Sequence, residues 1–242
     1  MRVLVVIPAR LASTRLPRKP LREIAGLPML AHVYDAVRSC PLLRAEDVLV
    51  ATDSDEIVTL CRERKYNVIL TSDRHHSGTE RVQEVASAIA ADIYLNIQGD
   101  EPLTRPEHIA ALVGLMAEPT VQVGTLKTPA AVEDVDNSNA VKVVTDAAGR
   151  ALYFSRARIP FDRDATGQVR CFKHLGFYAY RPLALAQFCR WPESTLERAE
   201  RLEQLRFLEN GISIHVAETP FDTIGVDTEE DLIRAEQRLR ER

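Results

Sequence analysis

The sequence predicts an α/β protein whose mostly parallel sheet carries helices on both faces. Short apolar, β-branched runs alternate with longer segments of helical periodicity through about the first 120 residues, and the connections between them are short. Strand-like runs then dominate as far as residue 180, which predicts an antiparallel, strand-rich insertion. The 242 residues are 45% apolar and 27% charged, as is usual for a folded globular protein.

The first half predicts four strand–helix pairs. Residues 3–7 are apolar throughout, which is typical of a strand buried on both faces. Further strands are expected at 47–51, 67–70 and 92–97, and helices at 28–38, 55–64, 77–90 and 106–116. Ser77 and Glu80 fit a capping box at the start of the third helix.

The second half predicts a different pattern that returns to the sheet. Strands are expected at 121–126, 141–145, 151–154, 172–180 and 213–216, with a turn over 146–149. Helices are expected at 182–189, 195–210 and 228–242, and Gly211 is placed to end the second of these. We interpret the chain as one domain, with a core formed by residues 1–120 and 211–242 and an insertion over residues 121–210.

Composition excludes several classes of protein. The 31 basic and 35 acidic residues give a net charge of −4, so the chain has no global basic footprint for nucleic acid. No apolar run is long enough for a signal peptide or a membrane span. The four cysteines form no C-x-x-C pair, which indicates free thiols in a reducing compartment. We therefore expect a cytoplasmic protein without membrane insertion.

The loops after the predicted parallel strands are the expected ligand site, because such sheets bind ligands beyond the carboxyl ends of their strands. The loop after the first strand holds five basic residues and one acid between Pro8 and Glu23. Arginine guanidinium groups can bind phosphate oxygens in pairs and lysine supplies a compact positive charge, so this loop suits a polyphosphate. A basic loop that is merely solvated would have the same composition. The loop is not a P-loop, and no G-x-G-x-x-G follows it.

Three further segments carry candidate chemistry. Asp100 follows a predicted buried strand and suits a hard cation, although a simple Gly-Asp turn explains it as well. Thr228 and Asp231 fit a capping box that leaves Asp227 outside it. The segment 71–81 enters a helix N-terminus with free N–H groups and small hydroxyls, and the role of Arg81 stays open there.

Several motifs in register resemble one family across the whole chain. The first loop, ARLASTRLPRKPL from Ala9, is followed by ATD at Ala51, TS at Thr71, SGTER at Ser77 and NIQGDEP at Asn96. Further on come NAVKVV at Asn139, ALYFSR at Ala151, HLG at His174, LEQLR at Leu202 and GVDT at Gly225. Together they resemble the 3-deoxy-D-manno-octulosonate cytidylyltransferases, or CMP-Kdo synthetases, which have a Rossmann-like nucleotide-diphospho-sugar transferase fold.

The resemblance implies a CTP site, a Mg²⁺ site and catalytic residues. It implies that Arg10, Arg15 and Lys19 hold phosphates and that Asp100 and Asp227 hold Mg²⁺, these five being the catalytic set. It implies that Arg74 and Ser77 contact the pyrimidine. The whole nucleotide-binding set is Pro8, Ala9, Arg10, Ser13, Arg15, Lys19, Arg74, Ser77, Gly78, Gln98 and Asp100.

The resemblance also implies an acceptor site for the sugar acid Kdo. The implied contacts are Gln98, Arg156, His174, Tyr178, Glu203 and Gln204. Core packing is the commoner role of a lone His or Tyr in a strand. The implied enzyme makes CMP-Kdo and diphosphate for lipopolysaccharide biosynthesis, and it is a cytoplasmic homodimer formed largely through the insertion.

One departure and three alternatives stay open. Arg18 stands where the family usually has Gly, which could change the turn of the loop or add a phosphate contact. A sialic acid cytidylyltransferase would carry an R-x-G-S-K-G type sequence that is missing here. An enzyme for an amino variant of Kdo would share every nucleotide motif. A catalytically dead nucleotide-binding regulator is disfavoured because Lys19, Asp100 and Asp227 are all present.

Overall fold

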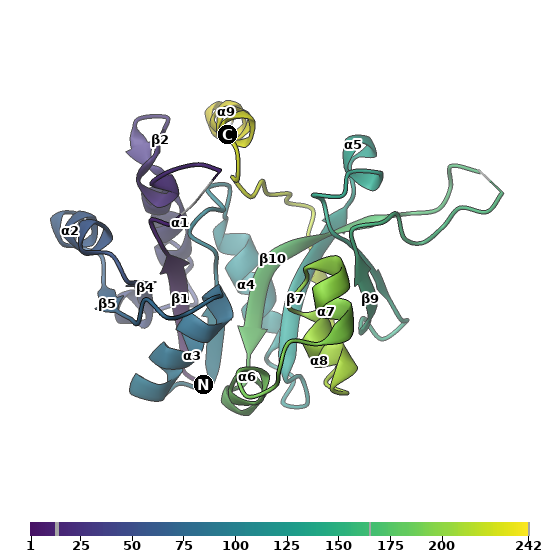
Figure 1. The fold of residues 1–242 in the computed structure, drawn as a ribbon, viewed down its shortest axis with the longest axis horizontal. Coiled ribbons are helices and arrows are strands. Elements are labelled where there is room, and N and C mark those ends of the chain that lie inside the picture. The colour runs from purple at the N-terminus through teal and green to yellow at the C-terminus, as the bar shows by residue number, and fades with distance from the viewer. Residues whose placement is uncertain (13–14, 165, 242) are drawn as a thin grey trace. The chain divides into compact units, whose positions relative to one another are not determined.

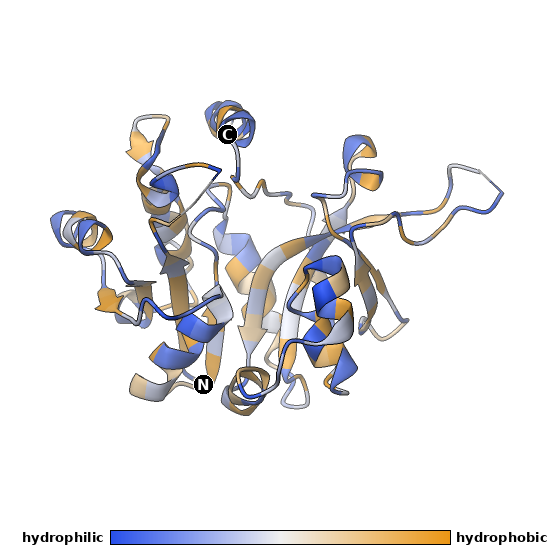
Figure 2. Cartoon of the chain, in the orientation of Figure 1, coloured by the Kyte–Doolittle hydropathy of each residue, from blue (hydrophilic) through white to orange (hydrophobic). Residues whose placement is uncertain are grey.

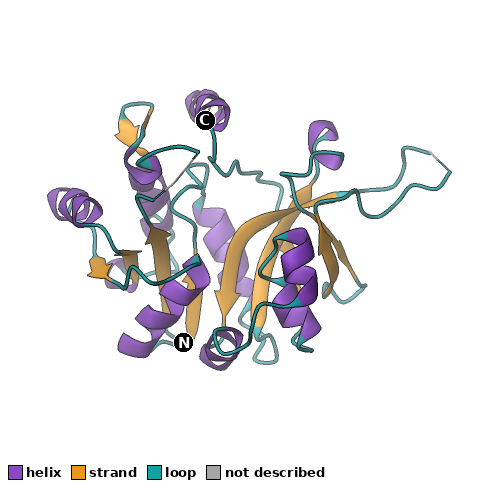
Figure 3. Ribbon diagram, viewed as in Figure 1, coloured by secondary structure: helices purple, strands orange, loops and turns teal. Residues whose placement is uncertain are grey.

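The computed structural model describes residues 1–12, 15–164 and 166–241 of the chain. They fall into two compact units. Unit 1 comprises Met1–Ala110 and Asp222–Arg242, and unit 2 comprises Ala111–Phe221. Figure 3 shows helices, strands and the loops that join them.

Unit 1 is built on parallel strands, as predicted. Strands β1 (Val3–Ala9), β4 (Val48–Thr52), β5 (Val68–Leu70) and β6 (Ile93–Asn96) lie in the order β6-β1-β4-β5. Each neighbouring pair is parallel. Strand β1 is buried along its whole length and is mostly hydrophobic in Figure 2, as expected for a strand covered on both faces.

The strand order reverses beside β1, and this determines where the helices lie. The chain runs from β1 out to β5 and then returns to β6 on the other side of β1. Right-handed crossovers therefore place α1 (Met29–Arg38) and α2 (Asp55–Glu63) on one face and α3 (Gly78–Ala88) on the other. Figure 1 shows α3 in front of β1 and α1 behind it. The carboxyl ends of β1 and β6 thus form the switch point where such sheets bind ligands.

The predicted helix caps are largely confirmed. The Ser77 hydroxyl accepts the N–H of Glu80, while the Glu80 carboxylate accepts the N–H of His76 at 2.7 Å instead of reaching back to Ser77. Thr228 and Asp231 form the full capping box of α9 (Glu229–Arg240). Short elements that periodicity did not predict precede α1, namely the 3₁₀ turn η1 (Lys19–Leu21) and the strands β2 (Glu23–Ile24) and β3 (Leu27–Pro28).

An apolar cluster ties the first loop to the C-terminal helix. Leu16 of the basic loop packs with Ile24, Met29 and Val226, and with Leu232 and Ala235 of α9. Each of these residues is at least 92% buried, so burial fixes the backbone on both sides of the cluster. The cluster thereby holds the basic loop and the stretch before α9 in one apolar core. Both segments carry predicted site residues.

Unit 2 is the strand-rich insertion, and its sheet has the order β11-β7-β10-β8-β9. The strands are β7 (Val123–Pro129), β8 (Lys142–Thr145), β9 (Ala151–Ser155), β10 (Phe172–Tyr180) and β11 (Ile214–Glu218). The pairs β10–β7, β10–β8 and β8–β9 are antiparallel, and β11 pairs with β7 in parallel. Helix α4 (Pro106–Leu115) precedes these strands, and the short helix α5 (Val132–Val135) follows β7.

The helical part of unit 2 corrects one prediction. Helix α6 (Pro182–Phe188) lies where it was expected. The prediction of a single helix over residues 195–210 is wrong. This segment forms two helices, α7 (Thr195–Glu200) and α8 (Leu205–Glu209), because Arg201 adopts a left-handed conformation with φ of 54°. Gly211 follows α8 with φ of 77°, as predicted. Among the described residues, no helix is long and apolar enough to span a membrane.

Candidate functional site

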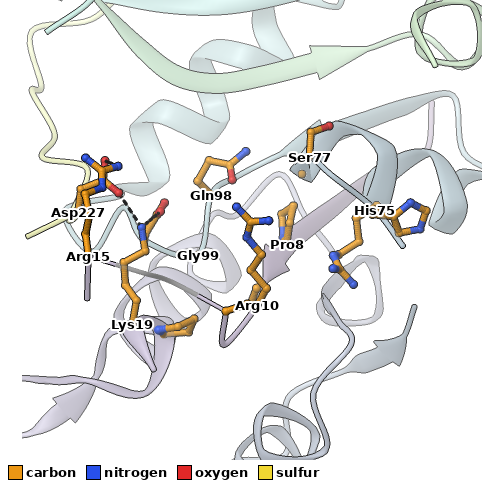
Figure 4. Close-up of a pocket in the computed structure, with 15 residues that line it drawn as sticks. Pro8, Arg10, Arg15, Lys19, His75, Ser77, Gln98, Gly99 and Asp227 are labelled. Carbon is orange, nitrogen blue, oxygen red and sulfur yellow. Dashed lines mark hydrogen bonds and ion pairs between the residues drawn. The ribbon is translucent and has the colours of Figure 1, made fainter. Parts of the chain in front are cut away.

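A pocket of about 480 Å³ lies in unit 1 at the carboxyl ends of β1 and β6 (Figure 4). Ten predicted residues line it: Pro8, Ala9, Arg10, Arg15, Lys19, Ser77, Gly78, Gln98, Asp100 and Asp227. Arg74 is not among the described lining residues, and Ser13 lies outside the part of the chain that the structure describes. The structure therefore brings together most of the predicted nucleotide-binding set.

Two glycines let the backbone close around this pocket. A Cβ on Gly99 would lie 2.9 Å from the carbonyl oxygen of Pro8, so only glycine fits between β1 and the loop after β6. A Cβ on Gly78 would lie 3.1 Å from the side-chain nitrogen of Gln98. The α3 N-terminus and the loop after β6 thus approach each other across the pocket, where free helix N–H groups favour an anion or a polar ring.

Lys19 joins the two predicted metal ligands. Its Nζ donates to Asp100 Oδ2 at 2.5 Å and to Asp227 Oδ1 at 2.9 Å, and Figure 4 shows its side chain pointing toward Asp227. Burial opposes the charge of the ammonium, but the ion pairs with Asp100 and Asp227 outweigh it and raise the pKa of Lys19. Arg15 pairs with the other oxygen of Asp227 at 2.9 Å. Two carboxylates from distant segments thus converge on a cation.

The segment that carries Asp227 is held by its neighbours on both sides. The N–H of Val226 donates to the carbonyl oxygen of Asp100 at 2.9 Å, and the Val226 side chain is buried in the apolar cluster. On the other side the N–H groups of Asp227 and Thr228 donate to the Asp231 carboxylate at 3.2 and 3.0 Å. The capping box of α9 therefore also positions the residue that precedes it.

Arg18 stands where the family usually has glycine, and it adopts a left-handed backbone conformation. Its φ of 57° and ψ of 31° lie in the left-handed region, which costs a non-glycine residue conformational energy. Its guanidinium pairs with Glu56 of α2. In this structure the side chain therefore engages α2 rather than the pocket.

Arg81 is a pocket residue whose role the sequence left open. Its side chain is 97% buried and pairs with Asp53 at 2.8 Å. The guanidinium also donates to the Thr71 hydroxyl and to the carbonyl oxygen of Ser72 at 3.3 Å. Arg81 thus ties α3 to the segments after β4 and β5. The ATD motif at Ala51 was the sequence signal that could have pointed to this partnership.

The loop over residues 71–77 has a second anchor. His75 lines the pocket and pairs with Glu84 of α3, and the N–H of Ser72 donates to the same carboxylate at 2.9 Å. The hydrogen bond from His75, aided by that from Ser72, lowers the pKa of Glu84. Arg74 is exposed, and its backbone N–H and Nε point to the Ser72 hydroxyl.

The predicted acceptor residues other than Gln98 lie in unit 2, and Arg156 is committed to the main chain there. Its Nε donates to the carbonyl oxygen of Glu200 at 2.7 Å. Its Nη1 donates to the carbonyl oxygen of Ser138 at 2.9 Å, and its Nη2 donates to that of Arg201 at 3.3 Å. The guanidinium thus joins β9 to the α7 end and to the loop before β8.

His174 and Tyr178 form a buried pair on β10, with ring centroids 5.4 Å apart. His174 Nε2 lies 2.9 Å from the Thr125 hydroxyl, and burial lowers the pKa of His174 to about 3. Burial raises the pKa of Tyr178 far above its usual value, and Glu203 adds to this rise. Gln204 is buried just before α8. The structure therefore groups His174, Tyr178 and Glu203.

The chain is similar to known proteins over its whole length. A family model described as cytidylyltransferase matches residues 4–214. A 3-deoxy-manno-octulosonate cytidylyltransferase from Koribacter versatilis (strain Ellin345) is 64% identical over 242 residues, which are 100% of this chain and 92% of that protein. An enzyme of the same name from Acidobacterium capsulatum is 59% identical, with 100% of this chain and 98% of that protein covered.

Solved structures agree with this result. A structure of CMP:2-keto-3-deoxy-manno-octonic acid synthetase complexed with CTP matches with a TM-score of 0.93 and 39% identity, covering 100% of this chain and 99% of the other. A cytidylyltransferase from Leptospira borgpetersenii matches with a TM-score of 0.63 at 16% identity, covering 96% of this chain and 83% of the other, which shows the fold alone. The predicted fold class is confirmed.

Proposed function

The chain belongs to the cytidylyltransferase family, and from that premise we propose that it transfers CMP from CTP to 3-deoxy-D-manno-octulosonate (Kdo). It is an enzyme of the nucleotidyltransferase class. The observation that carries the proposal is the convergence of Asp100 and Asp227 on Lys19, in a pocket that is also lined by Arg10 and Arg15. The names of the relatives supply the acceptor, since a fold alone does not specify a substrate.

The pocket of unit 1 suits the nucleotide in size and charge. Its volume of about 480 Å³ is within the usual range for small-molecule sites. Arg10, Arg15 and Lys19 bring three positive charges to its lining, where a triphosphate would need them. Ser77 and Gly78 bring the N-terminus of α3 to another part of the lining, where we place the pyrimidine.

Mg²⁺ fits the donor set of this pocket. Mg²⁺ is usually held by one or two carboxylates together with substrate phosphates. Asp100 and Asp227 already converge on one cation, the Lys19 ammonium, so their oxygens lie close enough to share a charge. We propose that both carboxylates hold Mg²⁺ with CTP. When bound, this ion would offset charge on the phosphates and lower the pKa of a coordinated hydroxyl.

The proposed reaction needs mainly positioning and charge neutralisation from the protein. The oxygen of the anomeric C2 hydroxyl of Kdo forms a bond to the α-phosphorus of CTP. The bond between that phosphorus and the bridging oxygen to the β-phosphate breaks, diphosphate leaves, and the hydroxyl proton is released. Lys19, Arg10 and Arg15 bind phosphate oxygens, and their charges stabilise the negative charge that develops on the departing diphosphate.

The acceptor contacts and the biological setting complete the proposal. We place Arg156, His174, Tyr178, Glu203 and Gln204 of unit 2 around the sugar acid. We further propose a cytoplasmic homodimer that activates Kdo for lipopolysaccharide biosynthesis. Unit 2 exposes large apolar side chains that a second copy could cover, among them Val132, Leu152 and Phe161 at 89%, 61% and 79% exposure.

A diphosphate-release assay tests the proposed function. The enzyme is given CTP and Mg²⁺ with Kdo, 8-amino-Kdo or sialic acid, and Kdo is expected to give the highest kcat/KM. Asp100→Asn should reduce the rate by about 1,000-fold or more, because one transition-state electrostatic contact is typically worth 100- to 1,000-fold and this change also removes a metal ligand. Its thermal unfolding should resemble that of the wild type.

Asp55→Asn is the matched control, because Asp55 is an exposed acid in the first turn of α2. It should keep the wild-type rate. Near-normal turnover by a folded Asp100→Asn variant would contradict the proposed role of Asp100. A wild-type enzyme that binds CTP but releases no diphosphate with any acceptor would contradict the proposed function itself.

A further inference from the structure

The spacing between the carboxylates of Asp100 and Asp227 involves a third side chain. Asp100 follows β6, whereas Asp227 lies in a stretch of unit 1 just before α9 that forms no helix or strand. Resting on the proposed function, in which both hold Mg²⁺, we propose that Glu101 is a positioning residue. It fixes the Asp227 segment against the Asp100 loop through Thr223 and does not bind the metal itself.

The Glu101 carboxylate is hydrogen-bonded to the Asp227 segment through Oε2, and its Oε1 lies close to Gly225 of that segment. The Thr223 hydroxyl donates to Glu101 Oε2 at 2.6 Å, and the two residues are 91% and 97% buried. On the other side, a Cβ added to Gly225 would lie 3.2 Å from Glu101 Oε1. The carboxylate is thus packed against residues 223–225, two to four positions before Asp227, where a buried and charge-assisted hydrogen bond is strong.

A second tether runs parallel to this one. The N–H of Val226 donates to the carbonyl oxygen of Asp100 at 2.9 Å. Glu101 itself is held by a turn, since its N–H donates to Gln98 and its carbonyl oxygen accepts from both the N–H and the hydroxyl of Thr104. One backbone bond and one side-chain bond therefore join the two segments on adjacent residues. Two such bonds fix both the separation and the relative rotation of the segments.

The lining of the pocket separates Glu101 from the proposed metal ligands. Of the described residues that line the pocket, Asp100 and Asp227 are the acids, and Glu101 is not among them. Neighbouring groups that orient metal ligands commonly contribute 10- to 100-fold to metal affinity. Loss of the Thr223–Glu101 hydrogen bond should therefore weaken metal binding without removing any ligand.

The test compares Thr223→Val, which deletes the donor with little change of shape, with Thr223→Ser, which keeps it. Mn²⁺ binding is measured by electron paramagnetic resonance on the full chain, with a non-hydrolysable CTP analogue bound. Thr223→Val should bind Mn²⁺ about 10-fold more weakly than the wild type. Thr223→Ser should match the wild type, and both should bind the analogue with wild-type affinity in EDTA.

Glu101→Gln separates positioning from direct metal binding. Its amide oxygen still accepts from Thr223, so its Mn²⁺ affinity should fall less than that of Thr223→Val. The reverse order, or wild-type affinity in a folded Thr223→Val variant, overturns the proposal. If Thr223→Val fails to fold, Glu101→Leu removes the same hydrogen bond from the other side and is expected to give the same 10-fold loss.

These measurements need no turnover, so they remain informative whatever the acceptor is. Diphosphate release by the wild type is measured in parallel. If the wild type is active and Mn²⁺ affinity does not depend on Thr223, the positioning role fails while the proposed function stands. If Mn²⁺ affinity falls as expected in a protein that releases no diphosphate, the proposed function fails while the positioning role stands.

Discussion

The two predicted ligand sites differ in how their side chains are engaged. In unit 1, ion pairs join the pocket residues Arg15, Lys19, Asp100 and Asp227. The Arg15 side chain is 63% exposed. In unit 2, the guanidinium of Arg156 is bound to three main-chain carbonyl oxygens. Both sets of residues were predicted from the same family resemblance. The set in unit 1 has the environment of a ligand site, whereas the set in unit 2 has largely the environment of a protein core.

Among the variants that test this comparison, Arg81→Met should have the largest effect, because Arg81 is buried and also lines the pocket of unit 1. Arg81→Met leaves the partly buried Asp53 without its partner and removes the hydrogen bond to Thr71, so the free energy of unfolding should fall by about 2 kcal/mol. The loop over residues 71–77 loses the anchor on Thr71 and Ser72, and a displacement of about 1 Å in a binding loop can cost about 100-fold in rate. Urea unfolding and kcat/KM for CTP measure the two effects.

Arg62→Met is the control, because Arg62 is an exposed arginine in the last turn of α2. It should leave both quantities near their wild-type values. A loss of stability in Arg81→Met without any loss in kcat/KM for CTP would show that Arg81 supports the fold alone. The use of CTP by the pocket of unit 1 would then not depend on the buried contacts of Arg81.

Arg81 also shows where prediction from sequence stops. Loops such as 8–23 could be assigned to a site because they follow buried strands, and every parallel strand of unit 1 was predicted. The helical spacing of Arg81 is equally typical of a surface charge, and it is the segments after β4 and β5 that supply its buried partners. The break between α7 and α8 was missed because Arg201 is not a residue that normally adopts a left-handed conformation.

A smaller effect is expected from Tyr178→Phe, which tests whether the buried cluster of unit 2 binds the acceptor. Removal of a hydroxyl that pairs with substrate typically costs about 1–1.5 kcal/mol, so KM for Kdo should rise about 10-fold while KM for CTP stays unchanged. Tyr180→Phe is the matched control, because Tyr180 is the buried next residue on the same face of β10 and stacks on Tyr178. Equal KM values for Kdo in both variants would contradict an acceptor role for Tyr178.

The last prediction is a pH dependence of stability that should arise in unit 2 from His174. Burial lowers its pKa from 6.5 to about 3, so the unfolded chain takes up a proton at this residue before the folded chain does. The stabilisation is complete above pH 6.5 and is lost as the pH falls toward 3, at up to about 1.4 kcal/mol per pH unit. Urea unfolding of the wild type at pH 6.5, 5.5 and 4.5 measures this slope.

His174→Gln should reduce the slope between pH 6.5 and 4.5, whatever its effect on absolute stability, because the titrating group is gone while an amide remains near the Thr125 hydroxyl. His76→Gln, a change at an exposed histidine, should keep the wild-type slope. An unchanged slope in His174→Gln would mean that His174 is hydrated enough to titrate normally in the folded protein. The cluster on β10 would then be open to solvent, and the contrast between the two predicted sites would disappear.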